Sequence, residues 1–150
     1  MRRSIAAALL LLAPLCHASA SESATLPDAA VFLVETFGAW DLDARRGQFR
    51  FVVTKRCSPE HCADHLYVQW IESVPGADGR HSHFAVLDSS RVSEIGDFAV
   101  VQQVTRVPPS SSIDVLVVNT YTMDESRFCV ALAVNPGSYV VNAAPCPPAV

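Results

Sequence analysis

Histidine side chains gather in one stretch of this 150-residue sequence, and imidazole is the commonest metal ligand in proteins. Four of the five histidines fall within 23 residues, namely His61, His65, His81 and His83. A zinc or copper ion needs three or four such ligands converging at about 2.0 to 2.1 Å. His81 and His83 share a face if their segment is extended. The alternative is that all four are solvated side chains at loops and strand ends, so both interpretations stay open.

Cysteine residues supply the second set of reactive groups. Four of them lie after residue 20, namely Cys57, Cys62, Cys129 and Cys146. Behind an export signal, an even number of cysteines predicts disulfides, and four cysteines allow three connectivities. We expect the two local bridges, Cys57–Cys62 and Cys129–Cys146. Free catalytic thiols are the competing interpretation, which an oxidising compartment disfavours because it tends to pair them.

Signatures of catalysis and of nucleotide cofactors are not found in the sequence. It has no Gly-x-Ser-x-Gly elbow, no phosphate-binding glycine loop and no dinucleotide fingerprint. We therefore expect no enzyme, and no cofactor beyond the zinc or copper considered above. The net charge of -4 disfavours nucleic acid as a partner. Five basic residues nonetheless gather between positions 45 and 56, either as ordinary surface charge or as part of a site for an anionic partner.

Residues 1–20 have the pattern of a secretory signal peptide. The start is positively charged, residues 5–15 are apolar, and residues 18–20 form a small-x-small cleavage site. The apolar run is shorter than the roughly 20 residues that a bilayer requires. We therefore expect cleavage, no stable membrane insertion and a secreted or periplasmic product. Residues 21–28 then form a flexible N-terminus, and residues 29–150 form a single β domain.

Residues 48–72 predict a β-hairpin whose register can be written out. If residues 58–61 form the loop, Cys57 lies opposite Cys62 and Lys55 lies opposite Asp64. The pairs on one face are then all apolar: Phe49 with Trp70, Phe51 with Val68, and Val53 with Leu66. A slip of one residue would turn these six side chains away from the core. The pattern therefore indicates a hairpin in which a disulfide pins the register.

A second hairpin is predicted over residues 98–122, around a turn at residues 108–112. The opposite charges of Arg106 and Asp114 favour the register that pairs them and that places Val107 opposite Ile113. Residues 113–118 are apolar on both faces, which indicates a central strand.

A third hairpin is predicted over residues 127–142. Pro136 and Gly137 occupy the central turn positions that these residue types favour. The resulting register places Cys129 opposite Ala144, close enough for a bridge to Cys146 after a local irregularity.

Shorter strands are expected at residues 83–88 and 39–43. Residues 29–37 fit either a helix that Gly38 ends or a strand, and we favour the strand. The count is seven or eight mostly antiparallel strands joined by short loops. The predicted fold is therefore an all-β meander that closes as a small barrel or packs as a sandwich.

Gly38-Ala39-Trp40 precedes a predicted strand and resembles the Gly-x-Trp sequence that opens the barrel in lipocalins. The resemblance covers three residues, and the later signatures of that family are not found. It implies a cup-shaped apolar cavity with Gly38 and Trp40 as structural residues near its closed end. The alternative is a core tryptophan that follows a turn glycine. Two other aromatic residues, Phe98 and Phe128, are assigned to the core.

These observations predict an exported, disulfide-stapled β domain that acts as a non-enzymatic binding module for an apolar small molecule or a protein partner. One alternative is an inhibitor of a wall-degrading or proteolytic enzyme, which would insert the loop at residues 58–61 or 108–112 into its target. Another is a His-rich metal-binding protein. A large interior cavity would favour the small molecule, whereas a filled interior with a protruding rigid loop would favour the protein target.

Overall fold

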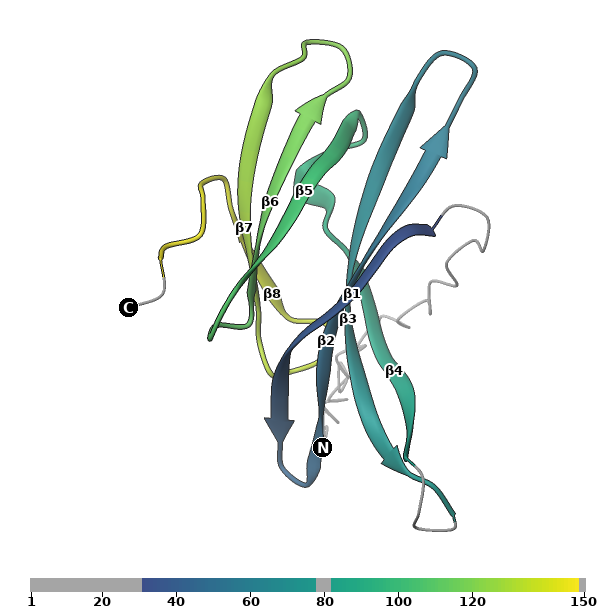
Figure 1. Ribbon diagram of the computed structural model, residues 1–150, viewed down its shortest axis with the longest axis vertical. Helices are drawn as coiled ribbons and strands as arrows, with labels where there is room; N and C mark the ends of the chain where they lie inside the picture. The colour runs from purple at the N-terminus through teal and green to yellow at the C-terminus, as the bar shows by residue number, and fades with distance from the viewer. Residues whose placement is uncertain (1–30, 78–81, 149–150) are drawn as a thin grey trace, which may run out of the picture.

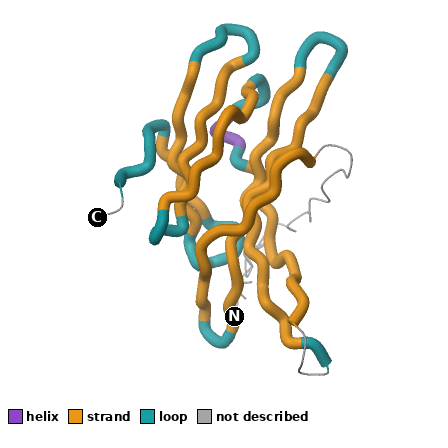
Figure 2. The backbone as a smooth tube through the Cα atoms, viewed as in Figure 1, coloured by secondary structure: helices purple, strands orange, loops and turns teal. Residues whose placement is uncertain are grey.

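The computed structural model describes residues 31–77 and 82–148, so the predicted export signal, the predicted flexible N-terminus and His81 lie outside the described residues. This part of the chain is all-β, with two four-stranded antiparallel sheets (Figure 1). The first sheet contains β1 (Val31–Leu42), β2 (Arg45–Cys57), β3 (Cys62–Pro75) and β4 (Ser82–Arg91). The second contains β5 (Ala99–Val107), β6 (Ser112–Asn119), β7 (Glu125–Leu132) and β8 (Tyr139–Asn142). A short 3-10 helix, η1 (Ser93–Ile95), lies in the connection between the sheets (Figure 2).

The two sheets pack as an open sandwich. The strand order follows the chain order in each sheet, and the chain passes from β4 to β5 through η1 without pairing these two strands. The sheets are therefore not closed into a barrel, and the sandwich is the confirmed alternative. The closed cup that the resemblance to lipocalins implies is wrong for this chain.

The hairpin of β2 and β3 has the predicted register along its whole length. Phe49 pairs with Trp70, Lys55 with Asp64, and Cys57 with Cys62. A disulfide joins the two cysteines, with an S–S distance of 2.00 Å. The six apolar side chains of the predicted face are all fully buried. Local alternation and a cross-strand cysteine pair therefore suffice to define this element.

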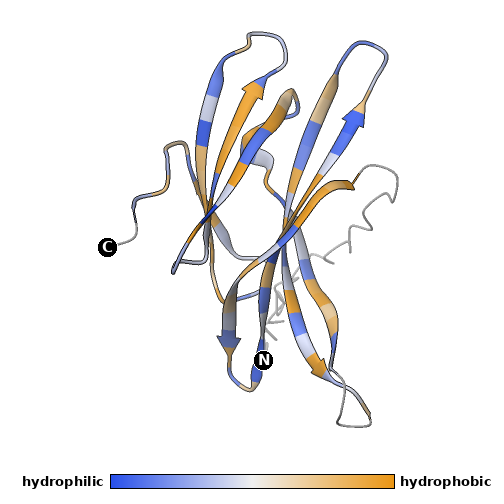
Figure 3. Ribbon diagram, viewed as in Figure 1, coloured by the Kyte–Doolittle hydropathy of each residue, from blue (hydrophilic) through white to orange (hydrophobic). Residues whose placement is uncertain are grey.

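Side chains from both sheets fill the space between them. The strands alternate between hydrophobic and hydrophilic residues (Figure 3) because successive side chains point to opposite faces. The first sheet contributes mainly aromatic residues to the core and the second mainly β-branched ones: Phe37, Trp40, Phe49, Phe51, Trp70, Ile113, Val115, Val117 and Val130. The core residues of the described chain pack in one cluster. The space between the sheets is therefore filled by side chains, as expected for a sandwich without a ligand cavity.

Three hydrogen bonds link the sheets across this core. The carboxylate of Asp64 is fully buried, and its Oδ2 accepts a hydrogen bond from the Val101 backbone N–H at 2.9 Å. Its Oδ1 lies 3.0 Å from Lys55 Nζ. The Trp70 indole N–H donates to the Ala133 carbonyl at 2.8 Å. The third link runs from the Tyr139 hydroxyl to the Arg91 carbonyl, also at 2.8 Å. These bonds fix the position of one sheet on the other.

The predicted register of the second hairpin is wrong by one residue. Arg106 pairs with Ile113, and Val107 pairs with Ser112, because the turn ends at residue 111 and Ser112 already belongs to β6. The expected pair of Arg106 with Asp114 does not form. Arg106 instead lies 2.9 Å from Glu35 of the other sheet. The prediction that residues 113–118 form a central strand is confirmed, because β6 lies between β5 and β7.

The third hairpin is also shifted, by two residues, so that Cys129 lies opposite Asn142 rather than Ala144. The predicted turn does form, with a hydrogen bond from the Ser138 N–H to the Asn135 carbonyl. However, the Ala133 N–H donates to the Ser138 carbonyl, which continues the pairing of Leu132 with Tyr139 and leaves residues 134–137 as the loop.

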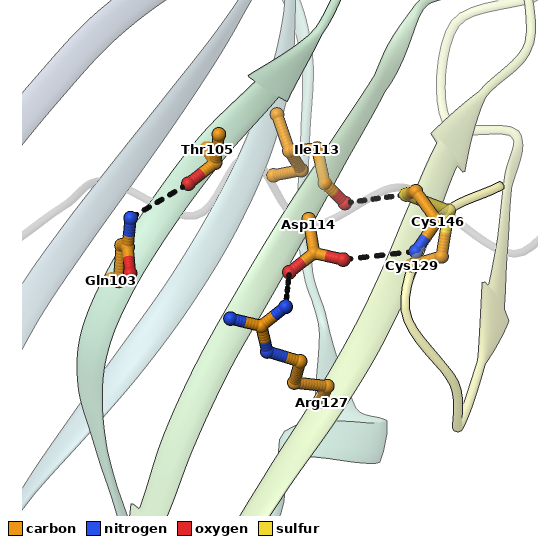
Figure 4. A network of polar contacts seen from close by, with 7 residues as sticks. All are labelled: Gln103, Thr105, Ile113, Asp114, Arg127, Cys129 and Cys146. Atoms are coloured by element: carbon orange, nitrogen blue, oxygen red, sulfur yellow. Dashed lines mark hydrogen bonds and ion pairs between the residues drawn. A yellow bond between two sulfur atoms is a disulfide. The ribbon is translucent and has the colours of Figure 1, made fainter. Parts of the chain in front are cut away.

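The Cys129–Cys146 disulfide forms as predicted, with an S–S distance of 2.03 Å. Asp114 supports it, because its Oδ2 accepts a hydrogen bond from the Cys146 N–H at 2.9 Å (Figure 4). Arg127 lies 3.8 Å from the other carboxylate oxygen. The segment after β8 is therefore held against β6 and β7 by one covalent and one charged contact.

Gly38 and Trp40 both have structural roles in β1, but only the Trp40 side chain belongs to the core. Gly38 has a φ of 53° and lies where the pairing of β1 with β2 shifts, which is typical of a glycine at a β-bulge. The predicted strands on either side of it therefore form one long strand, β1. Trp40 is buried and lies opposite Gly47, where an added Cβ would come within 2.7 Å of the indole ring. The interpretation of Trp40 as a core tryptophan is confirmed.

Candidate functional site

Three aromatic side chains meet at the end of the sandwich where β2 joins β3 and β6 joins β7. The ring of His61 lies 5.4 Å from that of Phe98 and 5.6 Å from that of Tyr121, between centroids. The rings of Phe98 and Tyr121 lie 5.2 Å apart and nearly edge to face. These spacings are those of packed aromatic pairs. We call His61, Phe98 and Tyr121 the loop-end aromatic cluster.

Ser58 holds the first loop of the cluster in place. Its backbone N–H donates to the His61 carbonyl at 2.8 Å, and its hydroxyl oxygen accepts hydrogen bonds from the N–H groups of Glu60 and His61. The Ser58 hydroxyl also lies 3.3 Å from His61 Nδ1. Because the Cys57–Cys62 disulfide closes the same loop, the His61 ring is presented on a constrained support.

Asn119 organises the second loop. Its side-chain oxygen accepts hydrogen bonds from the N–H groups of Tyr121 at 2.9 Å and Thr122 at 3.1 Å, as asparagine does in turns. Thr120 ties this loop to the β4–β5 connection, because its N–H and its hydroxyl both donate to the Phe98 carbonyl. The cluster is therefore built from three separate parts of the chain.

The cluster is exposed. Tyr121 is 63% exposed, Phe98 is 47% exposed, and Met123 in the same loop as Tyr121 is 70% exposed. The sequence-based assignment of Phe98 to the core is wrong, because Phe98 lies in the connection just before β5 and its side chain is exposed at the end of the sandwich. Large aromatic and methionine side chains are enriched at the centres of protein interfaces. This end of the molecule therefore has the composition of a binding surface.

A cleft of about 350 Å³ lies beside the cluster. Basic and polar side chains line it, and Phe98 and His61 form its border with the cluster. The lining residues include Arg56, Ser58, His61, His65, Arg91, Asp97 and Phe98. Arg91 forms an ion pair with Asp97. The Arg91 guanidinium holds the pKa of the Asp97 carboxyl below its usual value by hydrogen bonding and charge attraction.

His65 is a histidine of the cleft whose imidazole has a lowered pKa. Partial burial lowers the pKa of its imidazole, and the positive charges of Arg91 and Arg56 lower it further. The carboxylates of Asp97 and Asp64 act in the opposite direction. The balance favours a neutral ring at neutral pH.

This shift predicts a pH dependence of stability. In the unfolded chain the pKa of histidine is about 6.5, so below that pH the unfolded state binds more protons at His65 than the folded state does. Stability is therefore lost as the pH falls from about 6.5 through the folded pKa, whereas above pH 6.5 His65 makes no difference. Urea unfolding of the wild type and of His65→Gln at several pH values measures this. We expect the wild type to lose stability relative to the variant on acidification, and parallel pH profiles would contradict the assignment.

The four histidines proposed as metal ligands do not converge in the described residues. His61 and His65 border the same cleft, whereas His83 pairs with Val74 near the opposite end of β3. Val74 is nine positions from His65 along β3, which corresponds to roughly 30 Å. His81 lies outside the described residues. Within residues 31–77 and 82–148, no three His, Cys, Asp or Glu side chains are placed to hold one metal ion.

The two loops considered for an inhibitor differ in their surroundings. The loop at residues 58–61 is exposed over most of its length and belongs to the site just described. The turn predicted at residues 108–112 is also exposed at residues 108–110, but Ser111 is half-buried, accepts a hydrogen bond from the Leu132 N–H through its carbonyl and lies near Gly38 of β1. The basic residues of β2 do not form one site. Arg45 is ion-paired to Glu72, and Arg56 is the one basic residue of β2 that lines the cleft.

The site places exposed aromatic rings beside two guanidinium groups. No protein-family model, curated protein or solved structure matches this chain. In the part of the chain that the structure describes, no helix has the length and hydropathy needed to cross a membrane. The paired cysteines are typical of proteins from oxidising compartments.

Proposed function

We propose that this chain is an exported, disulfide-stabilised β-sandwich that binds a protein partner through its loop-end aromatic cluster. The observation that carries the proposal is the exposure of Phe98 and Tyr121 on loops that a disulfide and side-chain hydrogen bonds constrain. Exposed aromatic side chains on a constrained frame contribute binding energy at a small cost in conformational entropy.

A protein partner suits these observations better than an apolar small molecule does. The interior of the described sandwich is packed with side chains, so an enclosed site between the sheets has no support. The exposed cluster is instead flanked by an open cleft and by a further exposed side chain, Met123. Export is inferred from residues 1–20 together with the two disulfides.

Site-specific photo-cross-linking tests the proposal. A photoreactive phenylalanine analogue is placed at position 121 or at position 84 of the full chain, and each variant is made in the chain's own host. Phe84 is the matched control, because it is an aromatic residue with 65% exposure on β4 of the first sheet. We expect one discrete protein adduct at position 121 and none at position 84. An equal adduct at both positions, or no adduct at position 121, would contradict the proposal.

A second candidate function is inhibition of an exported hydrolase. The disulfide-closed loop at residues 58–61 favours it, because a constrained loop held by its own side-chain hydrogen bonds is suited to insertion into an active-site cleft. The cross-linked partner decides between the two. A hydrolase that loses activity when the purified chain is added supports inhibition, whereas a partner without hydrolytic activity rules it out.

A further inference from the structure

The cleft beside the aromatic cluster concentrates positive charge in an acidic chain. The whole sequence has a net charge of -4, yet two arginines, Arg56 and Arg91, line the cleft together with two histidines. Asp97 is the single carboxylate among the lining residues. Both guanidinium groups are near enough to the His65 ring to act on it electrostatically. The local charge is therefore opposite in sign to that of the molecule as a whole.

Asp97 indicates what kind of group the cleft accepts. Its carboxylate forms an ion pair with Arg91, and its side chain is 70% exposed. An ion pair as exposed as this one contributes little to stability, so an incoming carboxylate can replace Asp97 on Arg91 at small cost. Arg56 lines the same cleft and provides a second guanidinium group. Arginine binds carboxylates with two parallel hydrogen bonds, which gives such a contact geometric specificity.

We propose that this cleft binds a carboxylate side chain of the partner, adjacent to an apolar side chain that packs on the loop-end aromatic cluster. The partner segment is then an acidic peptide in which a glutamate or aspartate neighbours an aromatic residue. This inference rests on the proposed function for its biological meaning. The chemistry of the cleft can nevertheless be tested without knowing the partner.

The test compares two short probes that differ only in charge. Acetyl-Phe-Glu-amide carries one aromatic ring and one carboxylate, and acetyl-Phe-Gln-amide is its neutral analogue of nearly equal shape. Each is titrated into the full-length protein while the backbone amide signals of residues 56, 61, 91 and 98 are followed by nuclear magnetic resonance. We expect saturable shifts at these residues and a dissociation constant about fivefold lower for the glutamate probe, as one or two exposed charge pairs would give.

Three variants locate the charge effect. In the double variant Arg56→Gln/Arg91→Gln, the two probes should bind equally. In Arg45→Gln the preference should persist, because Arg45 is ion-paired to Glu72 outside the cleft. In Asp97→Asn, binding of the glutamate probe should tighten, because the Asp97 carboxylate no longer competes with the carboxylate of the probe for Arg91.

The outcomes separate this inference from the proposed function. Equal binding of both probes to the wild type would overturn the carboxylate site while leaving the aromatic cluster as a binding surface. A charge preference that survives the double arginine substitution would place the site elsewhere and overturn the inference as well. Absence of shifts with either probe would also overturn it, whereas the proposed function stands or falls on the cross-link at position 121.

Discussion

Replacing Trp70 by alanine is expected to lower the free energy of unfolding by about 3 to 5 kcal/mol, the range for truncating a large buried aromatic side chain. Trp70 is fully buried at the centre of β3 and packs edge to face on Phe49 at 6.1 Å. Its indole N–H also donates to the carbonyl of Ala133, which follows β7 of the other sheet. Small domains are stable by only about 5 to 15 kcal/mol, so this loss brings the variant close to unfolding.

Two controls make the Trp70 prediction specific. Trp70→Phe keeps most of the ring volume but leaves the Ala133 carbonyl without its indole donor, so we expect an intermediate loss. Phe84→Ala removes an exposed aromatic side chain from β4 and should change stability by less than about 0.5 kcal/mol. Urea unfolding followed by circular dichroism measures all three. A similar loss for Phe84→Ala and Trp70→Ala would show that the core has been assigned wrongly.

Removal of the Cys129–Cys146 disulfide is expected to have the next largest effect. The bridge closes a loop with a sequence separation of 17, for which the chain-entropy account gives about 3 kcal/mol. The same account gives about 2 kcal/mol for Cys57–Cys62, which spans only five positions. The double alanine variants at each pair, compared in urea, measure the difference.

The location of each bridge adds a second, qualitative expectation. Loss of Cys129–Cys146 should also weaken the bond from the Cys146 N–H to Asp114. The backbone from residue 143 onward should therefore exchange its amide hydrogens faster, while β2 and β3 remain protected. The opposite order of stabilities, with Cys57–Cys62 the more important bridge, would contradict this account. It would mean that the short bridge has a role beyond pinning the register of its hairpin.

The β2–β3 hairpin could be predicted from the sequence because its information is local. Alternating apolar residues, a short loop and two cysteines that face each other all require the same register. The register of β5 with β6 could not be predicted in this way. Residues 113–118 are apolar on both faces, so they fit the predicted alignment and the observed one, shifted by one residue, equally well. The opposite charges of Arg106 and Asp114 suggested a pair, but each finds its partner on another strand, Glu35 and Arg127 respectively.

The site could not be predicted, because it is assembled from segments far apart in the sequence. His61 and Tyr121 are 60 residues apart, and no periodic pattern relates them. The sequence contains only weak indications of this site. Tyr121 is an aromatic residue in a polar loop, and Phe98 follows an aspartate that is typical of turns. The histidines misled for a related reason, because antiparallel pairing of β3 with β4 places His65 and His83 toward opposite ends of the ladder.

The central claim is that the loop-end aromatic cluster binds a protein partner. The most direct measurement is the affinity of the purified chain for the cross-linked partner, determined by titration calorimetry for the wild type, Tyr121→Ala and Phe84→Ala. Truncation of an aromatic residue at the centre of an interface costs about 2 kcal/mol or more. We therefore predict that Tyr121→Ala weakens binding by about thirtyfold, while Phe84→Ala changes it less than about twofold. Equal affinities of Tyr121→Ala and the wild type would contradict the account.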